Sequence, residues 1–566
     1  MLSPLITLLI PALLSVSEPP VVPHTLRVAS VQMEVTDDLD RNLARILRGI
    51  DEARCAGARV VLFPETALSG FSKETIAALD WKRLEGAIQQ VAEAVKKSDI
   101  YAFYGCATPS GAAKPYNTAI LVGPDGNEVT RYHKMAPEPW FEPGDHLAYF
   151  EIDGIPCTAI LCHDERFPEL VRIPVLKGAE VCFYLSYEIN SLPKALQKME
   201  GYRAQLIARA VENNIWVLQS NGVGPLGETA AASLGQSRFV APDGTVAEEA
   251  PALVDTMIVR DIEPSRASRG NALESLGVKP LGEWWRAGIA QTLPSDAAPE
   301  QATAPAKSQA KLALMRGVPV KWDLKNNFDM FLRMAAEAAS KKADIFITPE
   351  CWLDGYAAPD KASTVEKLRG IAQNLESSPY LQRVAAEARS RNMYICFGFT
   401  SLENGKIFNA AGLWDRTGKL IGVYHKTHMQ THDLQFSPGE ALPVWDTEWG
   451  KVGIMICADR RWPETARTLR LKGARLILNP TYGMHHEKNE WWMRTRGYEN
   501  QCFIAFAHPN VGFVVDPGGD IAAKEESDSP GVLLCDVDLA EARDDNHLRN
   551  RRPELYGVIT EPKRPN

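Results

Sequence analysis

The chain has 566 residues, more than one ordinary domain usually holds, so two domains of about 250 residues each are the first expectation. Apolar residues make up 45% and charged residues 23%, as in soluble globular proteins. The formal net charge of −9 leaves no basic excess to neutralise phosphates, which argues against nucleic acid as a partner. The ten cysteines show no CxxC pair and no repeated spacing, so they predict neither a zinc site nor a disulfide framework.

The first 25 residues form a leader. An apolar stretch from Leu5 to Leu14 is followed by small residues in an A-x-A-like pattern at Ser15 and Ser17, which resembles a secretory signal peptide. The stretch is too short to span a membrane, and nothing later in the chain is long enough either. The pattern predicts a periplasmic or extracellular location. Two features argue against export: the leader has no Lys or Arg, and the cysteines show no pairing pattern. Without export, the protein is cytoplasmic.

The rest of the chain contains two copies of one pattern. Residues 26–70 and 311–355 each give a short apolar strand, a helix-like polar stretch and a second apolar strand that ends in Pro-Glu. Residues 115–134 and 407–426 align without a gap, and both read as a β-hairpin with a Gly-containing turn. Strands alternating with helical patterns predict an α/β class for each copy.

A segment rich in Ala, Pro, Ser and Gln separates the copies, as expected of a flexible linker. Of the strand-turn GQSRFVAPDG in the first copy, the second keeps only VDPGGD. The predicted organisation is a leader (1–25), a first domain (26–285), a linker (286–310) and a second domain (311–560).

Each copy has a cysteine where an apolar strand ends and a charged turn begins, Cys162 and Cys457. A side chain at such a strand-to-helix junction is held rigidly and points into a cleft. The amides of the turn can serve as an oxyanion hole. A thiol there is a candidate nucleophile if a neighbour lowers its pKa or removes its proton.

Two further residue types recur with the cysteine. Glu65 and Glu350 follow Pro at the end of a strongly apolar strand, where partial desolvation raises a carboxyl pKa and suits a general base. Lys134 and Lys426 end the hairpin in a shared Tyr-His-Lys, and a lysine beside a thiolate stabilises it. The Glu-to-Lys spacings are 69 and 76, and the Lys-to-Cys spacings are 28 and 31. Packing alone does not call for Glu and Lys at these positions, so the joint recurrence favours a catalytic set.

These motifs resemble the nitrilase superfamily of carbon–nitrogen hydrolases over nearly the whole chain outside the leader and linker. The matching motifs are PETALSG and PECWLDG, RYHKM and VYHKT, CHDERFPE and CADRRWPE, and RRPELY near the C-terminus. The resemblance implies two four-layer α-β-β-α sandwich domains, no metal or other cofactor, and a covalent thioester released by water. It also implies the roles of base for the glutamates, stabiliser for the lysines and nucleophile for the cysteines.

Members of this family commonly add a second glutamate between the lysine and the cysteine. In the first copy Glu138 matches that element, with Glu142 as the fallback. In the second copy Asp433 is the only carboxylate between Lys426 and Pro438, and its shorter side chain is expected to fall short. The second site is therefore the one whose activity is more in question.

The residues after each cysteine point to the substrate. Cys-His-Asp and Cys-Ala-Asp resemble amidases and carbamoylases rather than nitrile-cleaving members, and the amides of His163 and Ala458 would join the oxyanion holes. CADRRWPET resembles N-carbamoyl amino acid amidohydrolases, in which arginines matching Arg460 and Arg461 bind the substrate carboxylate. A paired arginine fork suits that task, whereas the alternative is that one arginine pairs with Asp459 or Glu464.

The interpretation is therefore a tandem thiol amidohydrolase acting on a small amide or N-carbamoyl compound, with its two domains paired inside one chain. Further homo-oligomerisation stays open, and no nucleic acid or membrane partner is expected. Two rivals stay open: an acyltransferase using the same thioester, and a pseudoenzyme pair with one working site. The spacing of His425, His428 and His432 allows a metal, but the first copy shares a histidine at the position of His425, which favours a structural role.

Overall fold

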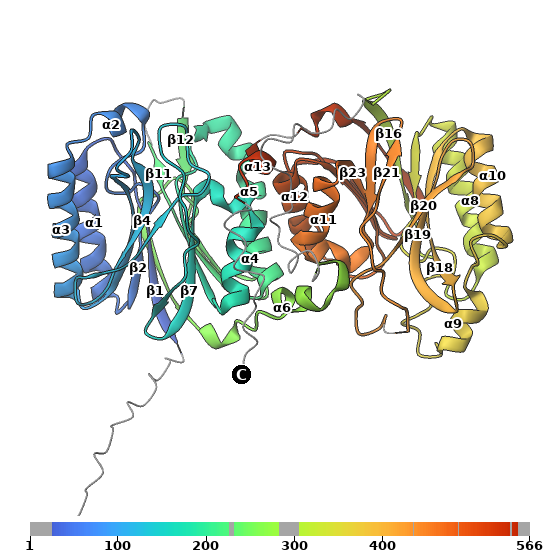
Figure 1. Cartoon of the computed structure of the whole chain (residues 1–566), viewed down its shortest axis with the longest axis horizontal. Coiled ribbons are helices and arrows are strands. Elements are labelled where there is room, and N and C mark those ends of the chain that lie inside the picture. Colours follow the sequence, from blue (N-terminus) through green and yellow to red (C-terminus); the bar gives the residue numbers. More distant parts are fainter. Residues whose placement is uncertain are drawn as a thin grey trace, which may run out of the picture.

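The computed structural model describes residues 25–225, 231–281, 305–433, 435–484, 486–543 and 546–552. The predicted leader, most of the linker and the RRPELY motif beyond its two arginines lie outside these residues. The described chain folds as two α/β units that lie side by side (Figure 1). None of the described helices is long and apolar enough to cross a membrane.

Each unit contains two six-stranded sheets. In the first unit the sheets run β15 (Thr256–Ile262), β1 (Leu26–Gln32), β2 (Val60–Leu62), β3 (Tyr101–Thr108), β4 (Tyr116–Val122), β5 (Glu128–His133), and β14 (Val246–Glu249), β13 (Arg238–Val240), β10 (Trp216–Asn221), β8 (Val181–Ser186), β7 (Ile155–Leu161), β6 (Phe150–Ile152). A smaller sheet joins β11 (Val223–Gly224), β12 (Ala231–Leu234) and β9 (Asn190–Ser191).

The second unit repeats the two six-stranded sheets strand for strand. They run β27 (Gly531–Asp538), β16 (Gln309–Arg316), β17 (Ile345–Ile347), β18 (Tyr394–Glu403), β19 (Lys406–Trp414), β20 (Leu420–His425), and β26 (Ile521–Glu526), β25 (Val511–Val515), β24 (Phe503–Ala507), β23 (Ala474–Pro480), β22 (Gly450–Ile454), β21 (Val444–Thr447). The β25–β26 hairpin matches β13–β14, so the expectation that the second copy keeps only a remnant of this strand-turn is wrong.

Helices cover the outer face of every sheet (Figure 1). The helices of the first unit are α1 (Leu39–Cys55), α2 (Lys73–Ala77), α3 (Trp81–Ser98), α4 (Pro168–Lys177), α5 (Leu192–Asn213) and α6 (Gly270–Gly277). Those of the second are α8 (Leu324–Ser340), α9 (Val365–Ile371), α10 (Pro379–Arg391), α11 (Pro463–Leu471), α12 (Lys488–Asn500) and α13 (Asn546–Arg549). Short 3₁₀ helices include η1 (Cys162–Arg166) and η4 (Cys457–Arg461), with η2 (Pro264–Arg266) and η5 (Leu539–Glu541) near the domain ends.

Helix α1 shows how the sequence sets these layers. The Asp38 carboxylate caps its first turn by accepting from the Asp40 and Arg41 amides. Its apolar side chains recur at a helical spacing on one face and are buried against the first sheet: Leu43, Ile46, Ile50 and Ala53. The layers are thus helix, sheet, sheet and helix in each unit, and the predicted pair of α-β-β-α sandwiches is confirmed.

The two units meet through α4 and α5 on one side and α11 and α12 on the other (Figure 1). Four buried arginines and four buried glutamates cross this contact in a nearly symmetric pattern. Arg209 pairs with Glu212 and Glu499, and Arg496 pairs with Glu499 and Glu212. Beside them, the Arg172–Glu464 ion pair (2.8 Å) is mirrored by Arg467–Glu169 (3.3 Å). Each interaction appears twice with the domains exchanged, as in the two-fold interface of a homodimer, and the predicted internal pairing is confirmed.

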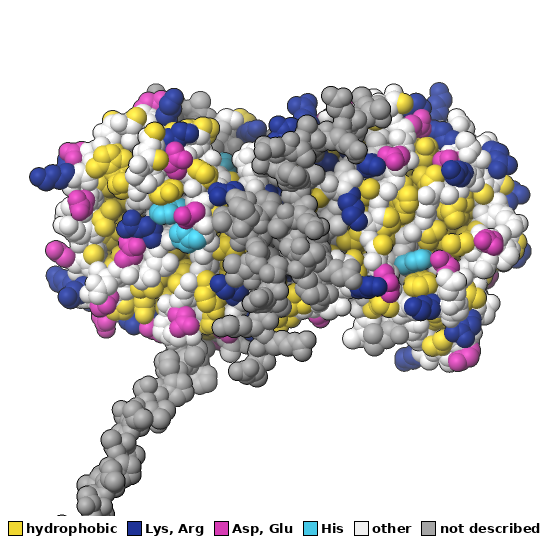
Figure 2. Space-filling view, viewed as in Figure 1, with side chains coloured by type: hydrophobic (Ala, Val, Ile, Leu, Met, Phe, Trp, Pro, Cys, Tyr) yellow, Lys and Arg dark blue, Asp and Glu magenta, His cyan; other side chains and the backbone are white. Residues whose placement is uncertain are grey.

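On the face shown in Figure 2, acidic and basic side chains are interspersed over both units. No single-sign field covers that face, as expected from the modest net charge.

Candidate active site

Each candidate nucleophile stands at a strained point of the backbone. Cys162 follows β7 and opens η1 with φ of 39°, and Cys457 opens η4 with φ of 46°. A left-handed conformation is rare for a residue with a side chain, and such strain is concentrated at functional sites. The turn therefore holds the thiol in one fixed direction at the end of the second sheet.

An aspartate two residues after the cysteine fixes this turn. Asp164 accepts hydrogen bonds from the Leu161 amide (3.2 Å), the Ala136 amide (3.2 Å) and the Tyr132 hydroxyl (2.8 Å). These bonds tie the cysteine turn to the segment that carries the lysine. Asp459 makes the same set of bonds with the matching residues Ile456, His428 and Tyr424.

In the first unit the predicted glutamates and lysine form one buried cluster. Lys134 Nζ lies 2.6 Å from Glu65 Oε1 and 2.9 Å from Glu138 Oε1. Asn117 Nδ2 donates to the same Glu65 oxygen at 2.7 Å. Glu65 Oε2 is buried without a hydrogen-bond partner. One oxygen of the expected base is thus free to accept a proton, and Glu138, not Glu142, is the carboxylate on the lysine.

The second unit builds the same cluster with an aspartate. Lys426 Nζ lies 2.8 Å from Glu350 Oε1 and 2.6 Å from Asp433 Oδ2. Asn409 Nδ2 donates to Glu350 Oε1 at 2.7 Å, and the Tyr356 hydroxyl donates to Asp433 at 2.8 Å. The expectation that Asp433 falls short is wrong. It stands seven residues after the lysine instead of four, and its side chain reaches the ammonium from there.

Charges in the first cluster perturb one another. Burial raises the pKa of Glu65, and the Lys134 ammonium only partly offsets it. Burial lowers the pKa of Lys134, but the nearby Glu138 and Glu65 outweigh burial and hold it well above its usual value. Burial also raises the pKa of the Cys162 thiol, and the Glu65 charge adds to this effect. A carboxyl of raised pKa beside a protonated thiol is the arrangement that general-base activation requires.

The His163 side chain lies at the edge of this cluster, with Nδ1 3.5 Å from Glu138 Oε1. The His163 side chain is 38% exposed, so it lies at the border of the site and not in its buried centre. The part that its backbone amide, and that of Ala458, would play in an oxyanion hole stays a prediction.

The two arginines after Cys457 are separated by the structure. Arg460 is buried and donates to Asn489 Oδ1 (2.5 and 3.0 Å), while its Nη1 lies 3.4 Å from Cys457 Sγ. Arg461 is partly exposed and donates to Gln430 at 2.9 Å, and its Nε is buried without a partner. Arg460 thus already has protein partners, and the binding of a substrate carboxylate by these two arginines stays a prediction.

Two features of the site were missed from the sequence. The amide that orients each base comes from Asn117 or Asn409, and the turn is fixed by Asp164 or Asp459. All four stand at identical positions of the aligned copies, so the repeat itself held the signal.

The three histidines near Lys426 bind protein groups: His425 contacts Glu403, His428 contacts Asp459, and His432 contacts Tyr356. Among the residues that the structure describes, no group of His, Cys, Asp and Glu is arranged to hold a metal ion.

Known proteins resemble parts of the chain that are each about one domain long. The family model for carbon-nitrogen hydrolases matches residues 27–270 and again residues 311–546. A protein of Pseudomonas protegens, called hydrolase in pqqF 5'region, is 32% identical over 270 residues, 44% of this chain and 92% of that relative. The omega-amidase NIT2-A of Xenopus laevis is 31% identical over 44% of this chain and 97% of its own, and the citrullinase of Francisella tularensis is 28% identical over 39% and 88%.

Among solved structures, an amidase of the nitrilase superfamily from Nesterenkonia AN1 is 23% identical with a TM-score of 0.40, covering 45% of this chain and 96% of its own. The two family matches together span most of the chain, and each falls on one sandwich domain with its own Glu-Lys-Cys cluster. The chain therefore belongs to the carbon-nitrogen hydrolase family, as a tandem pair of α-β-β-α sandwich domains, and is an enzyme acting on carbon–nitrogen bonds other than peptide bonds.

Proposed function

We propose that both domains are thiol amidohydrolases that cleave a small amide or N-carbamoyl compound through a thioester on Cys162 or Cys457. The observation that carries this proposal is the lysine held between two carboxylates beside each cysteine. Buried charges are costly unless paired, and a packing role does not require this arrangement to occur twice. Relatives named omega-amidase and citrullinase support the substrate class.

The proposed reaction has two halves. Glu65 takes the Cys162 proton, sulfur attacks the amide carbon, and the Lys134 ammonium and turn amides stabilise the oxyanion. The proton then passes from Glu65 to the leaving nitrogen as the C–N bond breaks and the thioester remains. In the second half Glu65 takes a proton from water, the resulting nucleophile attacks the thioester, and the thiol recovers its proton as the acid leaves. Glu350, Lys426 and Cys457 perform these steps in the second domain.

For the second domain the proposed substrate carries a carboxylate, as in an N-carbamoyl amino acid. Arg461 supports this, because its Nε is buried without a protein partner and its guanidinium lies over Trp492, 5.7 Å from the ring centroid. A desolvated guanidinium with a free donor is a good receptor for a carboxylate. Asp433 orients Lys426 in this proposal and does not contact substrate directly.

The test uses the full chain and its single-cysteine variants. Intact-mass spectrometry with a panel of amides and N-carbamoyl amino acids should show an acyl or carbamoyl adduct that maps to Cys162 or Cys457. Cys162→Ala and Cys457→Ala should each reduce the activity of their own domain by about a thousandfold or more. Cys55→Ala, at an exposed cysteine, is the matched control. Full activity in the double variant would contradict the mechanism. An amine-dependent product would show an acyltransferase instead.

A further inference from the structure

The two active sites differ in charge at two positions next to the thiol. Three residues after the nucleophile the first domain has Glu165 and the second has Arg460. Twenty-six residues after it the first has Glu188 and the second has Gly483. The strands leading to these positions pair in the same register in both domains, because Ala159 pairs with Phe183 as the matching Ile454 pairs with Leu478. The positions are therefore structurally equivalent.

Geometry in the second domain shows that both positions border the sulfur. Arg460 Nη1 lies 3.4 Å from Cys457 Sγ. A Cβ added to Gly483 would lie 3.9 Å from the same sulfur. Carboxylates at these two positions in the first domain are therefore placed where the part of the substrate next to the reacting carbon must lie.

The Glu165 carboxylate has unused hydrogen-bonding capacity. It is 2% exposed, and its Oε2 has no hydrogen-bond partner. Its other oxygen lies 4.0 Å from Arg166 Nε, and that nitrogen donates to the Tyr498 hydroxyl at 3.1 Å. Leaving a buried carboxylate oxygen unpaired is costly, so its retention beside the nucleophile points to a ligand that supplies the missing donor.

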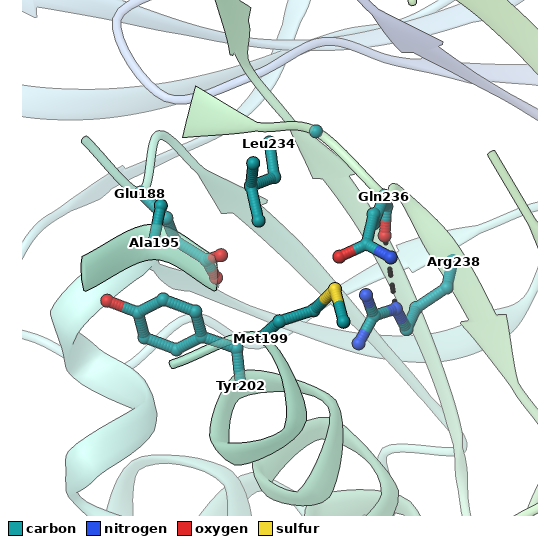
Figure 3. Close-up of a pocket in the computed structure, with 8 residues that line it drawn as sticks. Glu188, Ala195, Met199, Tyr202, Leu234, Gln236 and Arg238 are labelled. Carbon is teal, nitrogen blue, oxygen red and sulfur yellow. Dashed lines mark hydrogen bonds between the residues drawn. The ribbon is translucent and has the colours of Figure 1, made fainter. Parts of the chain in front are cut away.

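Glu188 lines a pocket between α5 and strands β12 and β13, together with Tyr202, Met199 and Arg238 (Figure 3). Its two oxygens accept from Gln219 (3.3 Å) and Asn221 (3.1 Å), which fixes the direction of the carboxylate.

The neighbouring cations all contact protein groups. Arg238 lies 3.2 Å from Glu249 and donates to the Gln236 carbonyl through Nε, although its Nη1 is buried without a hydrogen-bond partner. Lys198 Nζ lies 3.4 Å from the Tyr202 hydroxyl. Arg166 is held by Tyr498. In the second domain Arg460 takes the place of Glu165, Arg461 matches Arg166, and position 483 has no carboxylate.

We propose that the first active site takes an amide whose remaining part carries an ammonium group, with Glu165 and Glu188 as its receptor, so that the two domains act on substrates of opposite charge. This inference deepens the proposed function and rests on it. An ammonium supplies the donors that Glu165 Oε2 lacks, and charge-assisted hydrogen bonds to carboxylates are among the stronger ones in proteins. The same ammonium would be repelled by Arg460 and Arg461 in the second site.

The test compares three primary amides of similar length in the full chain: 4-aminobutanamide (cation), butanamide (neutral) and succinamate (anion). The Cys457→Ala variant reports the first site, and Cys162→Ala reports the second. In the first site kcat/KM should be about tenfold or more higher for the cation than for the neutral amide, from two charged hydrogen bonds. In the second site the anion should be the best of the three.

Matched variants connect this preference to the two carboxylates. In the Cys457→Ala background, Glu165→Gln and Glu188→Gln should each reduce the ratio of kcat/KM for the cation to that for the neutral amide by about fivefold or more. Glu151→Gln, on an exposed position of β6, should leave the ratio intact. Hydrolysis without a preference for the cation, or a preference that survives both substitutions, would overturn the inference alone. Release of no ammonia from any amide, with no adduct on Cys162, would overturn the proposed function and the inference with it.

Discussion

The two active sites share the lysine and its carboxylates and differ where the rest of the substrate must lie. Their bases differ in one contact, because Glu350 Oε2 accepts from the Tyr482 amide while Glu65 Oε2 has no partner. Both sites hold a lysine between two carboxylates, and both orient the glutamate with an asparagine. Beside the sulfur, however, one site has the Arg460 guanidinium and the other has the Glu165 carboxyl. The comparison teaches that a repeated catalytic set can be kept unchanged while a single position in the same 3₁₀ turn is free to reverse its charge.

Substitutions in the symmetric contact between the domains should have the largest effect, a loss of folding stability. Arg209→Met leaves Glu212 and Glu499 short of a buried cation, and should lower the free energy of unfolding by about 3–5 kcal/mol. Arg496→Met, its counterpart, should cost about the same amount. Urea unfolding followed by circular dichroism measures both. Arg27→Met removes an exposed ion pair with Asp261 and is the control, with a loss under about 1 kcal/mol. A large difference in unfolding free energy between the two interface variants would contradict the symmetric description of this contact.

The thiols themselves should differ in reactivity. Arg460 Nη1 donates to the Cys457 sulfur at 3.4 Å, whereas the matching residue beside Cys162 is Glu165, and burial and then the Glu65 charge raise the pKa of Cys162. Iodoacetamide near pH 7 should therefore label Cys457 about tenfold faster than Cys162 or more, read by peptide mass spectrometry. Arg460→Gln should slow labelling of Cys457 and leave that of Cys162 unchanged. Equal rates in the parent protein would remove the distinction.

The second domain also reaches the first site through Tyr498. Its hydroxyl accepts from Arg166, and the Arg166 guanidinium lies 5.8 Å from its ring centroid. Tyr498→Phe releases this arginine, which can then compete for Glu165. KM for 4-aminobutanamide in the Cys457→Ala background should rise about fivefold, by the loss of one hydrogen bond to a charged group. The same substitution in the Cys162→Ala background is the control and should leave the second activity unchanged. Equal effects on both sites would contradict the assignment.

A change of pH should have the smallest effect, on the substrate preference of the first site. Burial raises the pKa of Glu165 to about 8 and that of Glu188 to about 7; Arg166 and Lys134 oppose the first shift, and Arg238 and Lys198 the second. Raised values mean that both carboxyls lose their charge as pH falls through this range. The preference of the first site for 4-aminobutanamide over butanamide should therefore increase by about threefold from pH 6 to pH 9. A preference that decreases with rising pH would have the wrong sign.

Much of the architecture could be predicted because the chain provides its own comparison. The gapless match of residues 115–134 with residues 407–426 placed both lysines at the end of a hairpin, where the structure has them after β5 and β20. The cysteines were found at strand ends by the same means. The asparagines on the bases lay inside that match and were overlooked, since an amide carries no obvious chemistry until its carboxylate partner is seen.

Other features depend on distances that no spacing gives. Whether Asp433 reaches Lys426 depends on the path of a loop, and a shorter side chain alone gave the wrong answer. The separation of Arg460 from Arg461 depends on Asn489, which comes from a different helix. Arg209 and Arg496 each have one glutamate partner in the opposite domain, so matching the two segments in sequence could not reveal that they face each other.

Joining both copies in one polypeptide has a consequence for how they can change. In a homodimer every substitution at the two-fold contact appears twice, so neither site can be altered without the other. Here Tyr498 of α12 corresponds to Val211 of α5, and only the tyrosine holds an arginine next to a nucleophile. A covalent link keeps the halves together while each position mutates once. The two halves of the contact are therefore not required to have identical sequences, and each domain can specialise separately.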